Sequence, residues 1–128
     1  MIVIDCSVVV DALSGFGGDD LRASFEAEEL HAPSLLDYEV VSAVRGLVLV
    51  DRLSVPRARD LLADFDDLPI HRWPPADALR RRAFALPDNV SAYDGAYVAL
   101  AEALECPLLT RDARLGRTTG HDAEVLVR

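Results

Sequence analysis

Two short apolar runs, each followed closely by an aspartate, constrain the fold of this chain more than any other feature. Residues 2–4 lead directly to Asp5, and residues 107–109 lead through Thr110 to Asp112. Runs so short and so uniformly apolar are typical of strands buried on both faces, as in parallel sheets. Longer helical patterns lie between them, so the sequence predicts an α/β fold with a mostly parallel sheet covered by helices on both faces.

The segments between these runs alternate between helix and strand patterns in the same way. The glycines of the segment SGFGGDD lack the spacing of a dinucleotide-binding fingerprint, so this segment is expected to be a loop. Further strands are expected at residues 30–32, 68–73 and 123–127. Four serines suit the N-cap positions of helices, and the first of these helices should extend through Leu13. These serines are Ser7, Ser34, Ser54 and Ser91.

The length and composition set broad limits on function. A chain of 128 residues, 51% of them hydrophobic, fits one globular domain spanning residues 1–128. No apolar run approaches the roughly 20 residues that cross a bilayer, and no secretory signal pattern is visible, so a cytoplasmic protein is expected. The net charge of −9 argues against a protein that coats nucleic acid through a broad basic face. It leaves open an enzyme that binds nucleic acid through a metal ion and a few local cations.

Four carboxylates are candidates for one acidic site. Asp5 and Asp112 follow buried strands, and sites in parallel sheets form beyond the carboxyl ends of the strands. Asp94 lies in the first turn of an otherwise apolar helix, so this turn can reach the end of the sheet. Glu39 lies on one shoulder of the buried face of an earlier helix, and Asp37 on the other shoulder is a weaker candidate. Asp5, Asp94 and Asp112 each also have a structural alternative as a helix cap or first-turn acid.

A cluster of these acids would need a cation. Four carboxylates in a partly buried pocket repel one another strongly unless a positive charge neutralises them. Oxygen-only ligands favour hard divalent ions such as Mg²⁺ or Mn²⁺. Such an ion lowers the pKa of bound water and stabilises charge on a phosphoryl oxygen. The constellation therefore indicates a metal-dependent site suited to phosphate esters.

Four segments together resemble the PIN-domain nucleases, and among them the VapC-type ribonuclease toxins of bacterial toxin–antitoxin pairs. They are VIDCSVVV, the helix around Glu39, YDGAYVALA and LLTRDARL, in that order over the whole chain. The resemblance implies a catalytic and metal-binding quartet with two supporting hydroxyl groups. The quartet is Asp5, Glu39, Asp94 and Asp112, and the hydroxyls belong to Ser7 and Thr110.

The same resemblance carries expectations about fold, reaction and partners. It implies a single three-layer α/β/α domain with strand order 3-2-1-4-5, and a homodimer inhibited by a VapB-like antitoxin. It also implies Mg²⁺- or Mn²⁺-dependent endoribonuclease activity on RNA such as tRNA or ribosomal RNA, in which a metal-activated water attacks phosphorus. Gly95 departs from the family, which more often has alanine after the aspartate that matches Asp94.

Three arginines close to Asp112 are candidates for contact with RNA. Arg111, Arg114 and Arg117 are spaced by threes, so in a helix they would share a face near the proposed metal. Guanidinium groups in that position would hold RNA phosphates. The alternative is an ordinary solvated helix face.

Two other α/β classes fit less well, and one alternative function stays open. A receiver domain requires a lysine near its last strand, and the 13 basic residues of this chain are all arginine. A haloacid-dehalogenase-type phosphatase requires a second aspartate two residues after the first, where this chain has Ser7. The open alternative is a catalytically inactive PIN-like module that only binds or regulates a partner. Acid-to-amide changes in the quartet would leave the effect of such a module intact.

Overall fold

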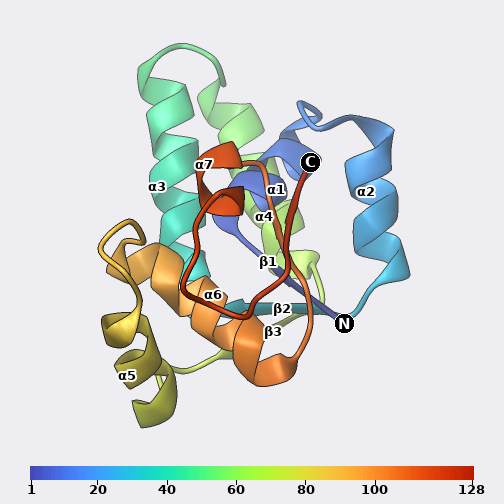
Figure 1. Ribbon diagram of the computed structural model, residues 1–128. Coiled ribbons are helices and arrows are strands. Elements are labelled where there is room, and N and C mark those ends of the chain that lie inside the picture. The colour runs from blue at the N-terminus through green and yellow to red at the C-terminus, as the bar shows by residue number, and fades with distance from the viewer.

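The computed structural model describes residues 1–128 as five strands and seven helices around one sheet (Figure 1). None of these helices combines the length and apolar character that a bilayer crossing needs. The strands and helices expected from the sequence are present near their expected places, but the second helix begins at Gly18, inside the SGFGGDD segment that was expected to be a loop. The strands are β1 (Ile2–Ile4), β2 (Leu30–Pro33), β3 (Ile70–Trp73), β4 (Leu108–Thr110) and β5 (Val125–Val127). The helices are α1 (Cys6–Ser14), α2 (Gly18–Ala27), α3 (Leu36–Leu49), α4 (Val55–Asp67), α5 (Asp77–Ala85), α6 (Ala92–Leu104) and α7 (Ala113–Gly116).

The sheet is fully parallel and its order is β3-β2-β1-β4-β5, which confirms the expected order 3-2-1-4-5. β1 is the central strand, with Ile2 opposite Leu30 of β2 and Ile4 opposite Leu109 of β4. Every residue of β1 is buried because both faces of the sheet are covered. This pairing brings the carboxyl ends of β1 and β4 together, so Asp5 lies beside the end of β4.

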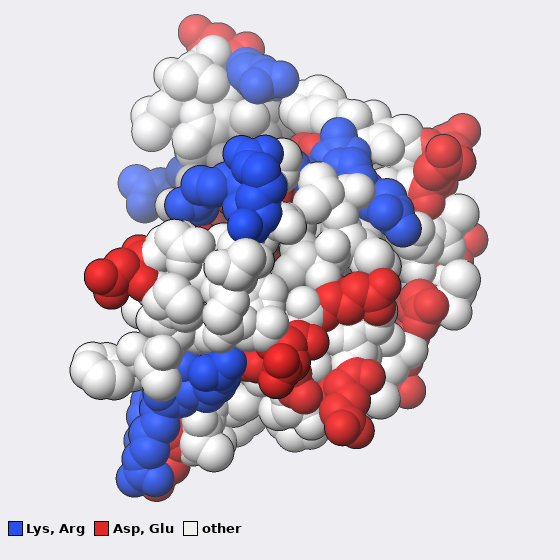
Figure 2. Space-filling view, viewed as in Figure 1, with Lys and Arg blue, Asp and Glu red and all other residues white.

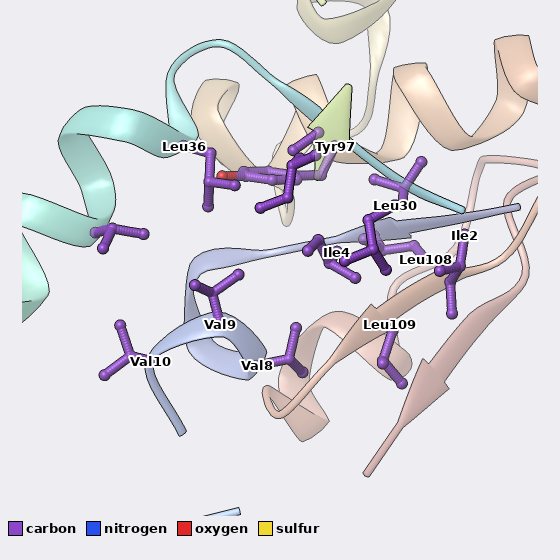
Figure 3. Packing of buried hydrophobic residues seen from close by; sticks show 14 of the residues in the cluster. Ile2, Ile4, Val8, Val9, Val10, Leu30, Leu36, Tyr97, Leu108 and Leu109 are labelled. Carbon is purple, nitrogen blue, oxygen red and sulfur yellow. The ribbon is translucent and has the colours of Figure 1, made fainter. Parts of the chain in front are cut away.

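Helices cover both faces of the sheet and complete the three-layer α/β/α arrangement expected from the sequence (Figure 1). α6 packs against β1, β2 and β4, and α5 packs along α6. α1 contacts β4 and is surrounded by α2, α3 and α4. Figure 3 shows the core around β1, with Tyr97 of α6 and Leu36 of α3 on one side of the strand and Val8 of α1 on the other.

The starts of α3, α4 and α6 test three of the expected serine caps. Ser54 and Ser91 cap α4 and α6 with their hydroxyl groups, as expected. The expectation for Ser34 is wrong, because the N-cap of α3 is Leu35 and no side chain caps this helix. The backbone N–H of Asp37 instead donates to the carbonyl of Ser34 at 3.3 Å, so backbone groups close the first turn.

The start of α1 also differs from the expectation, and the difference matters for the site. The helix begins at Cys6, directly after β1, so Asp5 is its N-cap and Ser7 already lies in the first turn. The Asp5 carboxylate accepts a hydrogen bond from the backbone N–H of Val8 at 3.3 Å. Because the strand leads straight into the helix, Ser7 is not needed as a cap and its hydroxyl is free to bond elsewhere.

Gly95, where the family more often has alanine, lies at a close contact between α6 and the end of α5. A Cβ atom at this position would lie 3.3 Å from a side-chain carbon of Leu86 and 3.4 Å from the carbonyl oxygen of Ala83. The first distance is tighter than an ordinary carbon–carbon contact, and the second is at the short limit of an ordinary contact. The glycine therefore lets the first turn of α6 approach α5 closely.

Candidate active site

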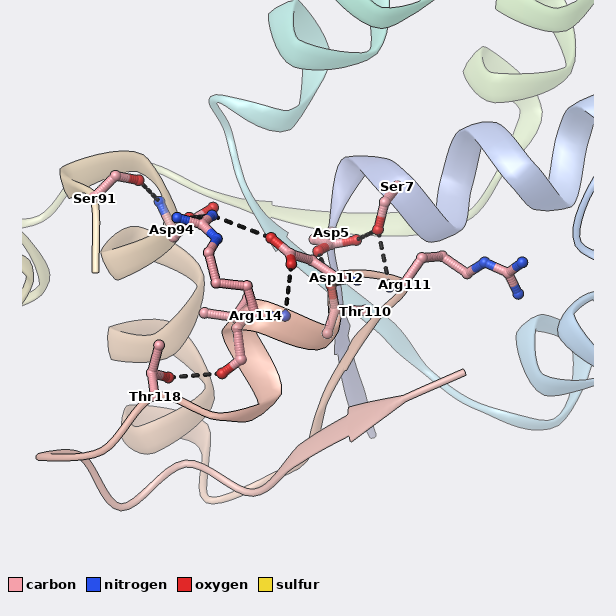
Figure 4. A network of polar contacts seen from close by, with 10 residues as sticks. Asp5, Ser7, Ser91, Asp94, Thr110, Arg111, Asp112, Arg114 and Thr118 are labelled. Atoms are coloured by element: carbon pink, nitrogen blue, oxygen red, sulfur yellow. Dashed lines mark hydrogen bonds and ion pairs between the residues drawn. The ribbon is translucent and has the colours of Figure 1, made fainter. Parts of the chain in front are cut away.

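Asp5 is held at the junction of β1 and α1 by two side-chain hydroxyl groups (Figure 4). Ser7 donates to one carboxylate oxygen at 2.5 Å, and the fully buried Thr110 donates to the other at 2.5 Å. Each hydroxyl also accepts from the backbone after β4, Ser7 from the N–H of Arg111 and Thr110 from the N–H of Asp112, both at 3.0 Å. The two hydroxyls therefore fix the carboxylate and join the end of β1 to the end of β4.

Glu39 is directed toward α6 from the first turns of α3. The phenolic hydroxyl of Tyr97 on α6 donates a hydrogen bond to the Glu39 carboxylate. Tyr97 is only 2% exposed, so its ring is held in place by packing and can orient the acid. Asp37, on the other shoulder of α3, pairs instead with Arg72 of β3 at 2.9 Å. The sequence pattern favoured Glu39 over Asp37 only mildly. The structure distinguishes them, because Glu39 bonds to α6 and Asp37 pairs with β3.

A single arginine joins Asp94 and Asp112. Asp94 lies in the first turn of α6, and Asp112 is the N-cap of α7, where it accepts the backbone N–H of Arg114 at 2.9 Å. The guanidinium of Arg114 donates to Asp94 at 3.1 Å and to Asp112 at 3.1 Å. Figure 4 shows this side chain extending from α7 to the two carboxylates. Asp112 is therefore a helix cap and a member of the acidic group at once.

The three arginines near Asp112 do not share a helix face. α7 is a single turn, so it is too short to align residues that span seven positions. Arg111 lies before this turn and pairs with Asp11 of α1 at 2.9 Å, on the side away from Arg114 (Figure 4). Arg117 lies beyond the turn and is exposed. Figure 2 shows cationic side chains over α7 and a separate group over α5. The expected common face is wrong, and contact of these arginines with RNA stays a prediction.

An apolar groove of about 610 Å³ lies between α3, α5 and α6. Its lining includes the exposed side chains of Tyr38, Trp73, Phe84 and Tyr93. Tyr38 directly precedes Glu39 in the chain, and Tyr93 directly precedes Asp94. The groove is therefore adjacent to the elements that carry two of the candidate acids.

The family of the chain follows from comparison with known proteins. The PIN domain family model matches residues 2–120. This chain belongs to the PIN-domain family. It is similar to two proteins of Mycobacterium tuberculosis, each aligned over 98% of this chain and 97% of the relative: Ribonuclease VapC12, 38% identical, and Ribonuclease VapC1, 43% identical. These relatives place this PIN domain in the VapC group. The crystal structure of VapBC2 from Rickettsia felis, bound to a promoter DNA fragment, matches 98% of both chains with a TM-score of 0.71 and 14% identity.

Two acids of this PIN domain are energetically costly to ionise. Burial raises the pKa of Asp5, and the hydrogen bonds from the two hydroxyls oppose that rise only in part. Burial likewise raises the pKa of Glu39, against the hydrogen bond from Tyr97, and the charges of Asp94 and Asp5 add to the increase. The carboxylates therefore lie near enough to repel one another, although they come from different elements.

The pKa of Asp112 is shifted in the opposite direction, downward. Burial tends to raise its pKa, but the hydrogen bonds from the side chain and backbone of Arg114 outweigh burial, so the pKa of Asp112 is lowered. The ionised form of this acid is stabilised by a positive charge that belongs to the protein itself.

The donor chemistry of the acidic group suits a hard divalent cation. The candidate ligands are all carboxylates, which Mg²⁺ and Mn²⁺ prefer over nitrogen or sulfur. In the arrangement observed, no three acidic, histidine or cysteine side chains are drawn together as they would be around one ion. Arg114 supplies the positive charge beside Asp94 and Asp112. The residue types thus fit the metal that the PIN family implies.

Two features of this PIN domain have no clear signal in the sequence. Tyr97 fits the apolar face of α6, and its partner Glu39 is 58 residues away, so no local spacing reveals the pair. The one available signal is that a buried tyrosine usually needs a partner for its hydroxyl. The bridging position of Arg114 is equally hidden, because its two carboxylates belong to different helices.

Proposed function

We propose that this chain is a metal-dependent endoribonuclease and the toxin of a VapBC-type toxin–antitoxin module in the cytoplasm, with residues 1–128 forming one PIN domain. One observation carries the proposal: the Asp5 carboxylate is fixed between Ser7 and Thr110 where β1 and β4 end side by side. The other three acids of the proposed site come from α3, α6 and the start of α7, and the charges of Asp94 and Asp5 act on Glu39. The full-length VapC relatives support ribonuclease activity as the reaction class.

Asp5, Glu39, Asp94 and Asp112 are the residues proposed to hold Mg²⁺ or Mn²⁺. A bound ion of this kind supplies a water of lowered pKa and stabilises negative charge on a phosphoryl oxygen. Burial is the main cause of the raised pKa of Glu39, and the charges of Asp94 and Asp5 add to it, so a cation at this place would stabilise the ionised acids.

Other side chains in and around this site orient the acids and hold the substrate. Ser7 and Thr110 keep the Asp5 carboxylate in one orientation, and Tyr97 does the same for Glu39. The arginines near Asp112 are proposed to neutralise phosphates of an RNA such as tRNA or ribosomal RNA. These are Arg111, Arg114 and Arg117.

A VapB-like antitoxin and a second copy of the chain are the proposed protein partners. The antitoxin follows from membership of the VapC group. For the homodimer, the supporting feature is the apolar groove between α3, α5 and α6, because contiguous exposed apolar surface commonly marks an interaction site. Phe84 is 91% exposed, so Phe84→Glu should leave the fold intact. Sedimentation equilibrium should show a dimer for the original chain and a monomer for this variant.

The reaction is tested by incubating purified, antitoxin-free protein with end-labelled total tRNA and ribosomal RNA. We expect discrete cuts with Mg²⁺ or Mn²⁺, none with EDTA, and none from Asp5→Asn with any metal. A matched pair on α3 sharpens the test. Glu39→Gln should abolish cleavage, whereas Asp37→Asn should retain it because Asp37 pairs with Arg72.

The inactive binding module makes a different prediction in cells. Expression of the chain should arrest growth if it is a ribonuclease toxin, and Asp5→Asn and Glu39→Gln should relieve the arrest. Growth arrest that persists in both variants, together with no cleavage in vitro, would favour a module that acts by binding alone.

A further inference from the structure

Arg114 forms ion pairs with two of the four candidate acids, Asp94 and Asp112. Its Nη2 atom lies 3.1 Å from an oxygen of Asp94 and 3.1 Å from an oxygen of Asp112. Its backbone N–H donates to the other Asp112 oxygen at 2.9 Å. Arg114 alone therefore contacts both oxygens of Asp112 and is the only cation paired with Asp94 (Figure 4).

The remaining acids have neutral partners only. Asp5 accepts hydrogen bonds from two hydroxyls and a backbone N–H, and Glu39 accepts one from Tyr97. No arginine pairs with either acid. The single positive charge inside the group is thus the guanidinium of Arg114, which contacts the oxygen atoms that a metal ion would bind.

We propose that Arg114 is the resident counter-cation of the acidic site, which a divalent metal ion must displace from Asp94 and Asp112 before it can bind both. This inference rests on the proposed metal-dependent function. The guanidinium and the ion require the same carboxylate oxygens, so binding of one opposes binding of the other. The resident arginine stabilises the acids when no metal is bound, and it weakens the apparent affinity for the metal.

The side chain is suited to such an exchange. Arg114 is 62% exposed, so its guanidinium can leave the carboxylates without disturbing the core. It lies on a one-turn helix, and its ion pairs are the exposed kind that contribute little stability each. A bound divalent ion carries twice the charge and coordinates the carboxylates directly. The metal ion should therefore displace the guanidinium, and its apparent affinity should be moderately lower than it would be without Arg114.

The test is the binding of Mn²⁺ alone, measured by isothermal titration calorimetry on protein freed of metal with EDTA and then dialysed. Arg114→Gln should bind Mn²⁺ roughly 3- to 10-fold more tightly than the original chain, as expected for the loss of exposed ion pairs. Arg117→Gln removes the same charge three positions away, where no carboxylate is paired, and should change the dissociation constant less than twofold. Arg114→Lys keeps the charge but lacks the planar guanidinium. Its dissociation constant for Mn²⁺ should lie between those of the original chain and Arg114→Gln.

Thermal melts provide an independent readout. In EDTA, Arg114→Gln should melt at a slightly lower temperature than the original chain, because Asp94 and Asp112 lose their cation. Saturating Mn²⁺ should raise its melting temperature by more than it raises that of the original chain. Mn²⁺ binding by Arg114→Gln that is equal to or weaker than that of the original chain would overturn the inference.

One further variant separates this inference from the proposed function. Asp112→Asn should lose most Mn²⁺ binding if the acids form the metal site. If the original chain and Asp112→Asn bind Mn²⁺ equally, the proposed metal site is wrong and the inference is overturned with it. If only the original chain binds the ion, the proposed site stands and Arg114→Gln alone decides the inference.

Discussion

The hydroxyl of Thr110, at the end of β4, donates a hydrogen bond of 2.5 Å to the carboxylate of Asp5, at the end of β1. The same hydroxyl accepts the backbone N–H of Asp112 at 3.0 Å. One buried side chain thus connects Asp5 and Asp112, two of the proposed metal ligands. Thr110 itself lies 105 residues after Asp5 in the sequence. The connection exists only because β1 and β4 are neighbours in the sheet.

Thr110→Val should weaken both the site and the fold. Valine has nearly the same shape and preserves the packing, but it leaves the Asp5 carboxylate short of a donor and the N–H of Asp112 without an acceptor. We expect the free energy of unfolding, measured by urea denaturation, to fall by about 1–3 kcal/mol. RNA cleavage should slow at least about tenfold, a loss worth about 1.4 kcal/mol of transition-state stabilisation. Thr110→Ser keeps the hydroxyl and should retain most of the cleavage; equal losses in both variants would point to packing instead.

Asp5→Asn should make the metal-free protein less sensitive to rising pH. Burial raises the pKa of Asp5 in the folded state, so ionising this acid is harder in the folded protein than in the unfolded chain. The original chain should therefore lose stability as pH rises from the ordinary aspartate value of about 3.9 through the raised folded value. Asparagine does not ionise and is an equally good N-cap.

The measurement is a series of thermal melts in EDTA between pH 4 and pH 7.5, which covers about the range where aspartates with raised pKa values titrate. The melting temperature of Asp5→Asn relative to the original chain should rise with pH. The lowered pKa of Asp112 acts in the opposite direction but is present in both proteins, so it cancels in the comparison. A large loss of stability in Asp5→Asn at every pH would mean that the charged carboxylate, which accepts hydrogen bonds from Ser7 and Thr110, stabilises the metal-free fold instead of destabilising it.

Tyr97→Phe should impair cleavage by releasing Glu39. The ring would still fill its buried position, but the carboxylate would lose the hydroxyl that orients it. We expect a cleavage rate lower by roughly tenfold and a loss of about 1 kcal/mol in the free energy of unfolding. Tyr93→Phe is the matched control, because Tyr93 lies on the same helix, is 69% exposed and should change neither quantity. Full activity in Tyr97→Phe would argue against a positioning role for Tyr97.

The sequence predicted those parts of the molecule that depend on local features. Short apolar runs locate β1 and β4, and the acids that follow them are at the sheet end because all strands are parallel. Ser54 and Ser91 cap their helices because a hydroxyl at that position reaches a backbone N–H within the same turn. The family resemblance added the strand order, which no local pattern contains.

The features that the sequence could not predict are contacts between distant segments. Whether Ser7 caps α1 depends on how directly β1 leads into the helix, and Asp5, two residues earlier, takes that place. The choice between Glu39 and Asp37 depends on Tyr97 and Arg72, which lie on other elements. The spacing of Arg111, Arg114 and Arg117 predicts a shared face only if the helix is longer than α7, which is a single turn.

Gly120→Ala should destabilise the fold through two separate effects. Gly120 has a φ of +85°, in the left-handed region that other residues adopt at a cost, and an added Cβ atom would lie 2.5 Å from Cγ of Pro87. Gly15 has a similar φ of +86° with no atom within 4 Å of an added Cβ, so Gly15→Ala isolates the backbone cost. By urea denaturation, we expect Gly15→Ala to lose about 1 kcal/mol and Gly120→Ala about 2–3 kcal/mol. Equal losses would mean that Pro87 moves aside freely and that the backbone conformation alone requires glycine at this position.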